Sequence, residues 1–392
     1  MSKSEKKYFE NFLPYGQHYI NEEDIKNVTE VLKSSWITQG DRVDEFEEKF
    51  SDYVGAKYAV AVSSGTTALH LSCLAAGAGS GDEVITSPMS FAASSNCALY
   101  CGARSVFSDV NNKGLIYKKQ IEKKITDRTK AIIPVHYTGL PCNMEPIKGL
   151  ADKYNLKIIE DACHALGAEY NGSKIGSCRY SDMSVFSFHP VKHITTGEGG
   201  IITTNSKDTY QYLKKLRAHG QEKEKKNFEN ESHGPWYYEI QDLGYNYRIT
   251  DIQCAIGISQ LDKVNDFVNK RQKLAHQYDK LIKNIDNVSS LYSFTKNSSY
   301  HLYVVTLDSE RLMSSKKEIF KELRDRNVGV HVHYVPIYKH PYYQENFDFN
   351  EDEYPKTEEL YDRILTLPMF PQMSIEDCEN VVEILSSVVE EI

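Results

Sequence analysis

The sequence predicts an α/β fold in which helices cover both faces of a mostly parallel sheet, followed by a smaller α+β domain. The chain has 392 residues, which is enough for two domains. From residue 57 onward, short β-branched runs alternate with helical stretches, as in parallel strands joined by helical crossovers. A long helical stretch then leads to a second, shorter set of elements. We expect a large domain with an N-terminal arm over residues 1–250, and a connecting helix with a small C-terminal domain over residues 251–392.

The N-terminal part is expected to hold an extended arm and two helices. The arm covers residues 1–20, and Asn21 with the acidic residues after it forms a helix N-terminus. The segment 36–40 interrupts the helical pattern, and the second helix ends at Gly55. The apolar residues that recur at helical spacing in the first helix are Ile25, Val28 and Leu32.

The alternating part is expected to supply the sheet. Strands are predicted near residues 57–62, 83–86, 104–108, 130–135 and 156–160, and helices near 66–77, 91–101, 118–124 and 144–155. Two further strands are predicted at 183–188 and 201–204, on either side of a connection that is rich in small residues and glycine.

The rest of the chain predicts an exposed loop and the smaller domain. Residues 221–235 are strongly polar and end in Gly-Pro, which is typical of a loop. A helix that is capped by Asp251 is expected to run to about residue 285. The later predicted elements are a strand at 301–307, a helix at 316–326, a strand at 328–335 and a helix at 374–388.

Composition limits the classes of function. Charged residues make up 26% of the chain and hydrophobic residues 40%, as in ordinary globular proteins. The net charge of −9 speaks against a nucleic-acid-binding surface. No apolar run has the length of a membrane span and no signal peptide is evident, so we expect a cytoplasmic protein without a membrane partner. The eight cysteines include no C-x-x-C pair, which favours reduced thiols.

Lys192 is the first candidate for chemistry. It lies on the connection between two predicted strands, and the small residues after it let another group approach the backbone. A lysine amine in such a place can form a Schiff base with a carbonyl when burial and neighbouring charge lower its pKa. An ordinary solvated lysine in a hairpin is the alternative.

Two carboxylates stand at the end of the predicted strand 156–160. Glu160 and Asp161 fall at its carboxyl end, where ligands bind in open α/β sheets. A carboxylate there can pair with the protonated ring nitrogen of pyridoxal phosphate. The alternative is that Asp161 caps the next helix.

A third candidate site is a small polar turn between a strand and a helix. Ser64, Gly65 and Thr66 place backbone N–H groups and hydroxyls at a helix N-terminus, which can cradle a phosphate. The turn is not a Walker sequence, because no Gly-Lys-Ser/Thr follows. An ordinary N-cap would look the same.

Several segments carry a resemblance that extends over almost the whole chain. They are Trp36-Ile-Thr-Gln-Gly, Ser63-Ser-Gly-Thr-Thr-Ala-Leu, Ser87-Pro-Met-Ser-Phe-Ala-Ala-Ser, Glu160-Asp-Ala-Cys-His-Ala-Leu-Gly-Ala, Ser187-Phe-His-Pro-Val-Lys, Thr195-Thr-Gly-Glu-Gly-Gly and Gly244-Tyr-Asn-Tyr-Arg. Together they resemble the DegT–DnrJ–StrS family of sugar aminotransferases. The resemblance implies the fold of type I pyridoxal-phosphate transferases, pyridoxal 5'-phosphate as cofactor, and Lys192 as the Schiff-base lysine.

The resemblance also implies cofactor contacts. Phe91 would stack on the pyridine ring, and Ser187 would bind the cofactor phosphate. His164, one helical turn after Asp161, would lie near the phenolic oxygen. For Phe91 and His164, a place in the hydrophobic core is the alternative. Asn246 would bind the phosphate of the neighbouring subunit's cofactor, which implies a homodimer with shared active sites.

The implied substrate is a nucleotide sugar. His189, Arg248 and Tyr334 would contact it. The nearest resemblance is to aminotransferases of pseudaminic acid biosynthesis, which implies transfer of an amino group from L-glutamate to C-4 of a UDP-4-keto-6-deoxy-N-acetylhexosamine. Another nucleotide-linked keto-sugar, of the dTDP or bacillosamine type, is an alternative, and so is a non-catalytic regulator.

Other chemistries have less support. Related sugar dehydratases replace the lysine by histidine, whereas this chain has Lys192. No cysteine is placed as a desulfurase would need. His331 and His333 are two apart on a predicted strand, but without a third ligand we expect no metal site.

Overall fold

The computed structural model describes residues 7–308, 310–312 and 314–391, so the first six residues of the predicted arm lie outside the described residues. Its main sheet has seven strands in the order β1-β9-β8-β5-β4-β2-β3. Their bounds are Tyr58–Val62 (β1), Glu83–Thr86 (β2), Arg104–Phe107 (β3), Thr129–Ile133 (β4), Lys157–Asp161 (β5), Met183–Ser187 (β8) and Gly200–Thr204 (β9). Within this sheet β9 pairs antiparallel with both neighbours and the other pairs are parallel, which confirms the predicted fold class.

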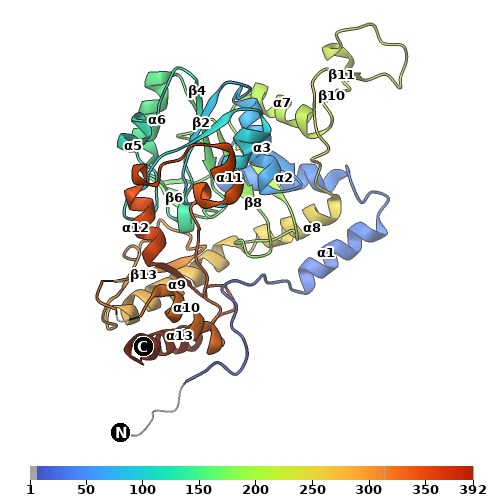
Figure 1. Ribbon diagram of the computed structural model, residues 1–392. Helices are drawn as coiled ribbons and strands as arrows, with labels where there is room; N and C mark the ends of the chain where they lie inside the picture. Colours follow the sequence, from blue (N-terminus) through green and yellow to red (C-terminus); the bar gives the residue numbers. More distant parts are fainter. Residues whose placement is uncertain (1–6, 309, 313, 392) are drawn as a thin grey trace.

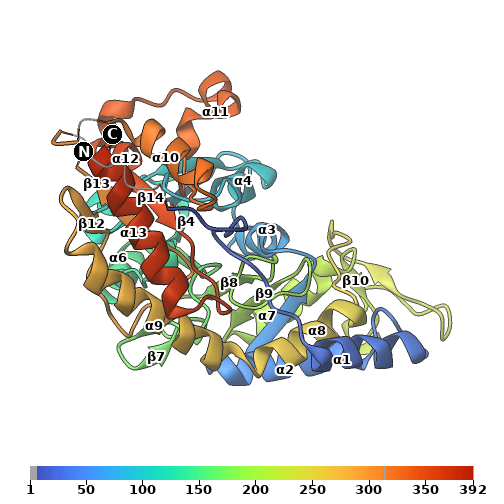
Figure 2. The same cartoon turned by 90° about the horizontal axis from the view of Figure 1, so that it is seen from below.

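Helices cover both faces of the sheet (Figures 1 and 2). One face packs on α3 (Gly65–Ala75), α4 (Ala93–Tyr100) and α7 (Lys207–Arg217). The other face packs on α2 (Asp41–Val54), α5 (Lys118–Glu122), α6 (Met144–Tyr154) and α8 (Asp251–Leu261). The alternation of side chains along each strand explains this division: Val60 and Val62 of β1 face the first set, whereas Ala59 and Ala61 face the second.

A second core lies around a smaller antiparallel sheet of three strands. The strands are β12 (Val288–Ser290), β13 (Tyr303–Leu307) and β14 (Ile364–Leu367), and the helices that pack there are α9 (Val264–Ile282), α10 (Lys316–Asp325) and α13 (Ile375–Glu391). The shorter helices α11 (Pro341–Asn346) and α12 (Pro355–Arg363) lie between α10 and β14 in the chain. None of the helices in the described ranges is long and apolar enough to cross a lipid bilayer.

Two predictions about the C-terminal half are wrong. The helix expected from residue 251 to about 285 is two helices, with a break between Leu261 and Val264. The predicted cap is wrong as well: the N-cap of α8 is Thr250, whose hydroxyl accepts from the backbone N–H of Gln253, and Asp251 is the first helical residue. The division at residue 250 stays a prediction, because α8 packs against α1 and α2 while α9 contributes to both cores.

The strand predicted at 328–335 is also wrong. This segment has isolated bridges only, from Val328 to Leu13 and from His331 to Thr366. Its backbone therefore changes partner along its length, and a strand of regular pairing cannot form. One of these partners belongs to the N-terminal arm, which lies along the small domain: the N–H of Gly329 donates to the carbonyl of Leu13 (2.7 Å), and Asn327 Nδ2 donates to the carbonyl of Phe9 (2.9 Å).

The first helix, α1 (Glu22–Lys33), has the predicted N-cap but an unexpected orientation. Asn21 and Asp24 form a capping box, and Asp24 is buried against α8, where it accepts from Gln260 and Lys263. Val31 is buried, but Ile25 and Leu32 lie on the outside and are 50% and 59% exposed. A polar residue of α1 therefore anchors it to α8, while two of its large apolar side chains are left uncovered by the described part of the chain.

The polar stretch 221–235 is part of an exposed arm rather than a plain loop. β10 (Gln221–Glu222) pairs with β11 (Glu239–Ile240), and Figure 1 shows the arm projecting from the body of the molecule. Trp236 and Leu243 on this arm are 76% and 86% exposed. Like the outer side of α1, the arm presents large apolar side chains that none of the described residues covers.

Candidate active site

A cavity of about 840 Å³ opens beyond the carboxyl ends of β5 and β8, between the large core and the segment 331–343. Ten of the twelve residues predicted for the site line this cavity. They are Ser64, Gly65, Thr66, Phe91, Asp161, His164, Ser187, His189, Lys192 and Tyr334. Asn246 and Arg248 are not among the lining residues of this chain, and Asn246 is exposed on the surface.

Asp161 is the last residue of β5 and is 5% exposed at the floor of the cavity. Its Oδ2 accepts from Ser94 Oγ (2.6 Å) and its Oδ1 accepts from the N–H of Cys163 (3.2 Å). The chain after it forms turns, so Asp161 caps no helix, and His164 is not one helical turn away as predicted. Nothing in the sequence indicates Ser94 as a partner, because the pairing depends on how α4 lies on the sheet.

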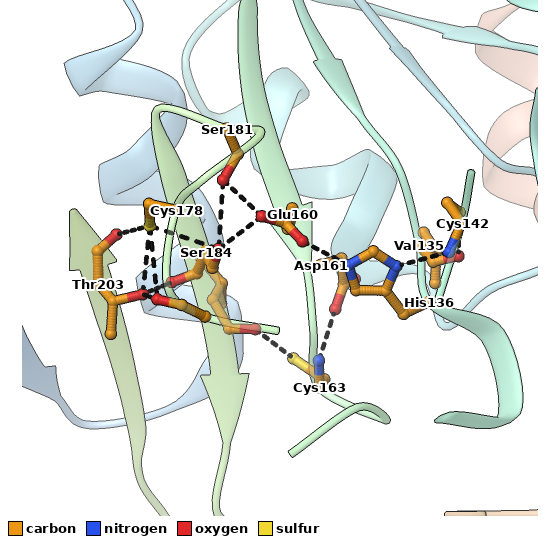
Figure 3. A network of polar contacts seen from close by, with 12 residues as sticks. Val135, His136, Cys142, Glu160, Asp161, Cys163, Cys178, Ser181, Ser184 and Thr203 are labelled. Atoms are coloured by element: carbon orange, nitrogen blue, oxygen red, sulfur yellow. Dashed lines mark hydrogen bonds and ion pairs between the residues drawn. The ribbon is translucent and has the colours of Figure 1, made fainter. Parts of the chain in front are cut away.

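Glu160 points to the opposite side of the sheet from Asp161, into the network that Figure 3 shows. It is 3% exposed and accepts from His136 Nε2 (2.7 Å), Ser184 Oγ (3.0 Å) and Ser181 Oγ. Burial alone would raise the pKa of Glu160, but these hydrogen bonds outweigh it and lower the pKa. The carboxylate thus ties β5 to its two neighbours and fixes the strand end that carries Asp161.

Replacement of Glu160 by alanine is expected to lower the free energy of unfolding by about 3 kcal/mol at pH 7, because three buried donors lose their acceptor. Since folding lowers the pKa of Glu160, its stabilisation is present above the unfolded pKa of about 4.3 and is lost as the pH falls further. Urea unfolding at several pH values measures this, with exposed Glu48→Ala as control. Equal stability of the two variants at pH 7 would contradict the role given to Glu160.

The N-terminus of α3 forms the end of the cavity next to Ser187. The Ser64 hydroxyl accepts from the N–H of Thr67 (3.1 Å), whereas the N–H groups of Gly65 and Thr66 begin the helix and have no acceptor inside it. A Cβ on Gly65 would lie 2.8 Å from Ser187 Cβ, and one on Gly200 would collide with the carbonyl of Ser64. Glycine at both positions therefore lets two amides and two hydroxyls converge on one point, as a phosphate requires.

Lys192 lies on the closed connection between β8 and β9. Its backbone N–H donates to the carbonyl of His189 (2.9 Å), and farther along Thr196 N–H donates to the carbonyl of Phe188 (3.0 Å). Burial lowers the pKa of the Lys192 amine, against the opposing effect of Cys163 and Asp161. Lys192 lines the cavity, so the solvated-hairpin alternative does not describe it, and a lowered pKa favours the neutral amine that attacks a carbonyl.

Aromatic and imidazole side chains form much of the rest of the wall. Phe91 precedes α4 and is 64% exposed over the cavity, so it is not a core aromatic and its ring is free to stack on a ligand. His164 is 5% exposed and its Nε2 lies 3.0 Å from Tyr334 Oη. Tyr15 also lines the cavity. We did not predict this, because the N-terminal arm that carries Tyr15 reaches the site by packing along the small domain, a contact that the sequence does not indicate.

His331 and His333 form no metal site with the groups around them. Their rings stack 4.5 Å apart, and His333 Nδ1 bonds Thr366 Oγ1 (3.0 Å). Within the described ranges no group of three His, Cys, Asp or Glu residues could hold a metal ion. Both histidines instead lie in the wall of the cavity.

These groups fit pyridoxal 5'-phosphate. The amides and hydroxyls at α3 and Ser187 suit its phosphate, and Asp161 suits its ring nitrogen. Phe91 suits a ring face and Lys192 suits the aldehyde. Each match follows from the donor or acceptor type of the residue and from its place in one cavity.

Comparison with known proteins gives a consistent picture. The profile of the DegT/DnrJ/EryC1/StrS aminotransferase family matches residues 18–386. The chain is 38% identical over 382 residues to the spore coat polysaccharide biosynthesis protein SpsC of Bacillus subtilis, with 97% of each chain covered. It is 37% identical over 384 residues to the UDP-4-amino-4,6-dideoxy-N-acetyl-beta-L-altrosamine transaminase of Campylobacter jejuni, with 97% of this chain and 98% of the relative covered.

Solved structures are similar over the same length. Helicobacter pylori PseC, an aminotransferase involved in the biosynthesis of pseudaminic acid, has a TM-score of 0.90 and 34% identity, and the match covers 97% of this chain and 100% of PseC. The Streptococcus pneumoniae protein Spr1654, solved in a PLP-form, has a TM-score of 0.87 and 29% identity over 97% of this chain and 99% of its own. A PMP-form of the same protein is also similar.

Proposed function

This chain belongs to the DegT/DnrJ/EryC1/StrS aminotransferase family, and on that premise we propose that it transfers an amino group from L-glutamate to C-4 of a UDP-linked 4-keto-6-deoxy-N-acetylhexosamine. The broader activity is that of a sugar aminotransferase with pyridoxal 5'-phosphate as cofactor. The likeness to PseC and to the Campylobacter transaminase along the full length of each chain supports the finer assignment, which would be a step of pseudaminic acid biosynthesis.

The proposed roles follow from the chemistry of each side chain. When bound, pyridoxal 5'-phosphate supplies an aldehyde that bonds amines and a ring that accepts electrons. The Lys192 amine would hold the cofactor and, once released, move a proton between the substrate and cofactor carbons as general base and acid. Asp161 would keep the ring nitrogen protonated. Ser64, Gly65 and Ser187 would hold the phosphate.

A related nucleotide sugar is the second candidate substrate. The similarity to SpsC is as high as that to the Campylobacter transaminase, and SpsC is named for the biosynthesis of spore coat polysaccharide. A dTDP-linked or bacillosamine-type keto-sugar would use the same cofactor residues. A non-catalytic regulator is disfavoured, because Lys192 and Asp161 both lie in the cavity.

The substrate proposal is tested with purified holoenzyme and L-glutamate. Product formation is followed by mass spectrometry with the UDP-N-acetyl keto-sugar and with a dTDP-4-keto-6-deoxyhexose. We expect a clearly higher kcat/KM for the UDP sugar. Equal or better amination of the dTDP sugar would refute the substrate assignment and leave the reaction class intact.

We also propose a homodimer with shared active sites. The outer side of α1, the connection after it and the arm around β10 and β11 expose large apolar side chains, among them Trp36, Trp236 and Leu243. A second copy is the partner that would cover them. Asn246 is exposed and outside the cavity of its own chain, as a residue that serves a neighbouring site would be. The eight free cysteines suit the proposed cytoplasmic location.

Mixing of inactive subunits tests the shared site. Asn246→Ala is expected to weaken cofactor retention, because one donor to the phosphate is lost. When Lys192→Ala and Asn246→Ala subunits exchange, one site of each mixed dimer would combine an intact lysine with an intact asparagine. We expect up to about half of the sites in mixed dimers to regain activity. No recovery after mass spectrometry has shown subunit exchange would rule out a shared site.

A further inference from the structure

The hydrogen bond between Tyr334 and His164 lies in the cavity wall, and none of the roles above explains it. Burial lowers the pKa of His164 well below its usual value, and the charge of Lys192 adds to this effect. Burial likewise raises the pKa of the Tyr334 phenol. The bond of 3.0 Å therefore joins two neutral groups, and only one of them can supply the hydrogen.

The second nitrogen of His164 decides which group donates. A neutral imidazole carries one hydrogen, on Nδ1 or on Nε2. His164 Nδ1 is buried and has no hydrogen-bond partner among the described residues. A buried N–H without an acceptor is rarer in proteins than an acceptor without a donor. The hydrogen is accordingly assigned to Nε2, which donates to Tyr334 Oη.

Tyr334 then keeps its own hydrogen for another acceptor. Among residues 7–308, 310–312 and 314–391, His164 is the sole hydrogen-bond partner of its hydroxyl. Tyr334 lines the cavity together with Lys192 and Asp161, and the neighbouring backbone is held by the Tyr137 hydroxyl, which donates to the carbonyl of His333. The Tyr334 O–H is thus free to donate to whatever enters the cavity.

The small domain holds His164 in this orientation. The rings of His164 and His301 lie 4.4 Å apart, and His301 is 4% exposed. The backbone at His301 is in turn fixed by the buried guanidinium of Arg271, whose Nη1 donates to the carbonyls of Tyr300 (3.3 Å), His301 (3.1 Å) and Met369 (2.9 Å). A ring packed in this way cannot turn to present Nδ1 to Tyr334 without disturbing the floor of the site.

We propose that Tyr334 is a catalytic residue that donates a hydrogen bond to a negatively polarised oxygen in the cavity, and that His164 is a positioning residue that sets the direction of this bond. The inference rests on the proposed aminotransferase function and assigns two groups within the same site. The oxygen belongs either to the ring hydroxyl of pyridoxal 5'-phosphate or to the carbonyl of the keto-sugar. The hydrogen stays on Tyr334, so no covalent bond forms or breaks.

Neutron diffraction from deuterium-exchanged crystals of the holoenzyme tests the orientation directly and needs no sugar. We expect deuterium on His164 Nε2 and on Tyr334 Oη, with the O–D directed away from the imidazole. Deuterium on His164 Nδ1, with the Tyr334 O–D directed at Nε2, would overturn the inference whatever the substrate of the enzyme is.

A pH titration of the visible absorption band of the holoenzyme identifies the cofactor as acceptor. If Tyr334 donates to the ring hydroxyl, Tyr334→Phe raises the pH midpoint of the absorption change by about one unit. A shift of this size corresponds to the loss of one hydrogen bond to a charged group. The other titratable groups that face Tyr334 are Tyr15, Tyr137, Asp161, Cys163 and His333. Those that face His164 are Lys192, His193, His301 and His333. Tyr154→Phe, on the surface of α6, is the control, and thermal unfolding shows that each variant is folded.

A single-turnover assay tests whether the sugar carbonyl accepts the hydrogen bond from Tyr334. In this assay, enzyme that already carries the amino group is mixed with the UDP-linked keto-sugar. If Tyr334 donates to the sugar carbonyl, Tyr334→Phe leaves the pH midpoint unchanged and lowers the single-turnover rate about 10²-fold. His164→Leu should lose the same factor, and His164→Gln, whose amide can still donate to Tyr334, should restore most of it. A Tyr334→Phe enzyme with both the midpoint and the rate of the wild type refutes the proposal. A wild-type enzyme that leaves the UDP sugar unchanged refutes the proposed substrate instead.

Discussion

Lys192→Ala is expected to reduce turnover by at least about 10⁴-fold, the upper end of what one positioned acid–base group contributes. The variant loses both the amine that bonds the cofactor aldehyde and the amine that moves the proton. In the cavity no other lysine lies among the lining residues, so no neighbouring amine can replace it. Single-turnover kinetics with L-glutamate and the keto-sugar measure the effect.

The same variant should still bind pyridoxal 5'-phosphate. The converging amides and hydroxyls at the start of α3 and at Ser187 are intact, and so is Asp161. We expect cofactor retention on gel filtration together with a changed absorption band, since the aldehyde is no longer bonded to the protein. Lys57→Ala, an exposed lysine before β1, is the control. Wild-type activity in Lys192→Ala would refute the assignment of the active site.

Replacement of Asp161 should have the second largest effect. Asp161→Ala removes the carboxylate from the cavity floor and is expected to lower the rate by about 10²–10³-fold, as for the loss of one preorganised electrostatic partner. Asp161→Glu keeps a carboxylate and should retain far more activity. The physical reason is that a ring nitrogen holds its proton only next to a negative charge.

Ser94 supplies the control for Asp161. Its hydroxyl donates to Oδ2 of Asp161, so Ser94→Ala tests how much the anchoring of the carboxylate matters. We expect a loss smaller than that of Asp161→Ala, measured by the same single-turnover assay. Equal losses in Asp161→Ala and Asp161→Glu would show that Asp161 is only structural.

Local signals in the sequence predicted the strands, the helix starts and the residues around the cavity. The β-branched runs predicted all the parallel strands, because a strand buried on both faces is apolar along its whole length. Ser64 and Gly65 were predicted from a local pattern, in which a helix-capping serine is followed by a glycine that lets another group approach the backbone. Asp161 was predicted because a strand end in such a sheet is a known place for ligands.

Features that depend on distant contacts were not predictable in this way. The apolar stripe of α1 has the helical period, but the period does not tell whether this chain or another one covers it. The break after Leu261 and the irregular path of 328–335 depend on packing against α1 and on the N-terminal arm. The pairing of His164 with Tyr334 spans 170 residues, and no local pattern predicts it.

The contact between the N-terminal arm and the small domain has a consequence for biosynthesis. Phe9 and Asn327 are bonded although 318 positions separate them. Because the ribosome makes the arm first and its partner segment near the end, the arm has no place to dock while most of the chain is being made. The large sheet can fold around its own cores during that time, since its pairings lie within residues 58–204. The arm can therefore reach its partner segment only after residue 329 has been made, and Tyr15 can bond the backbone of Met369 only later still, so this wall of the cavity depends on a late part of synthesis.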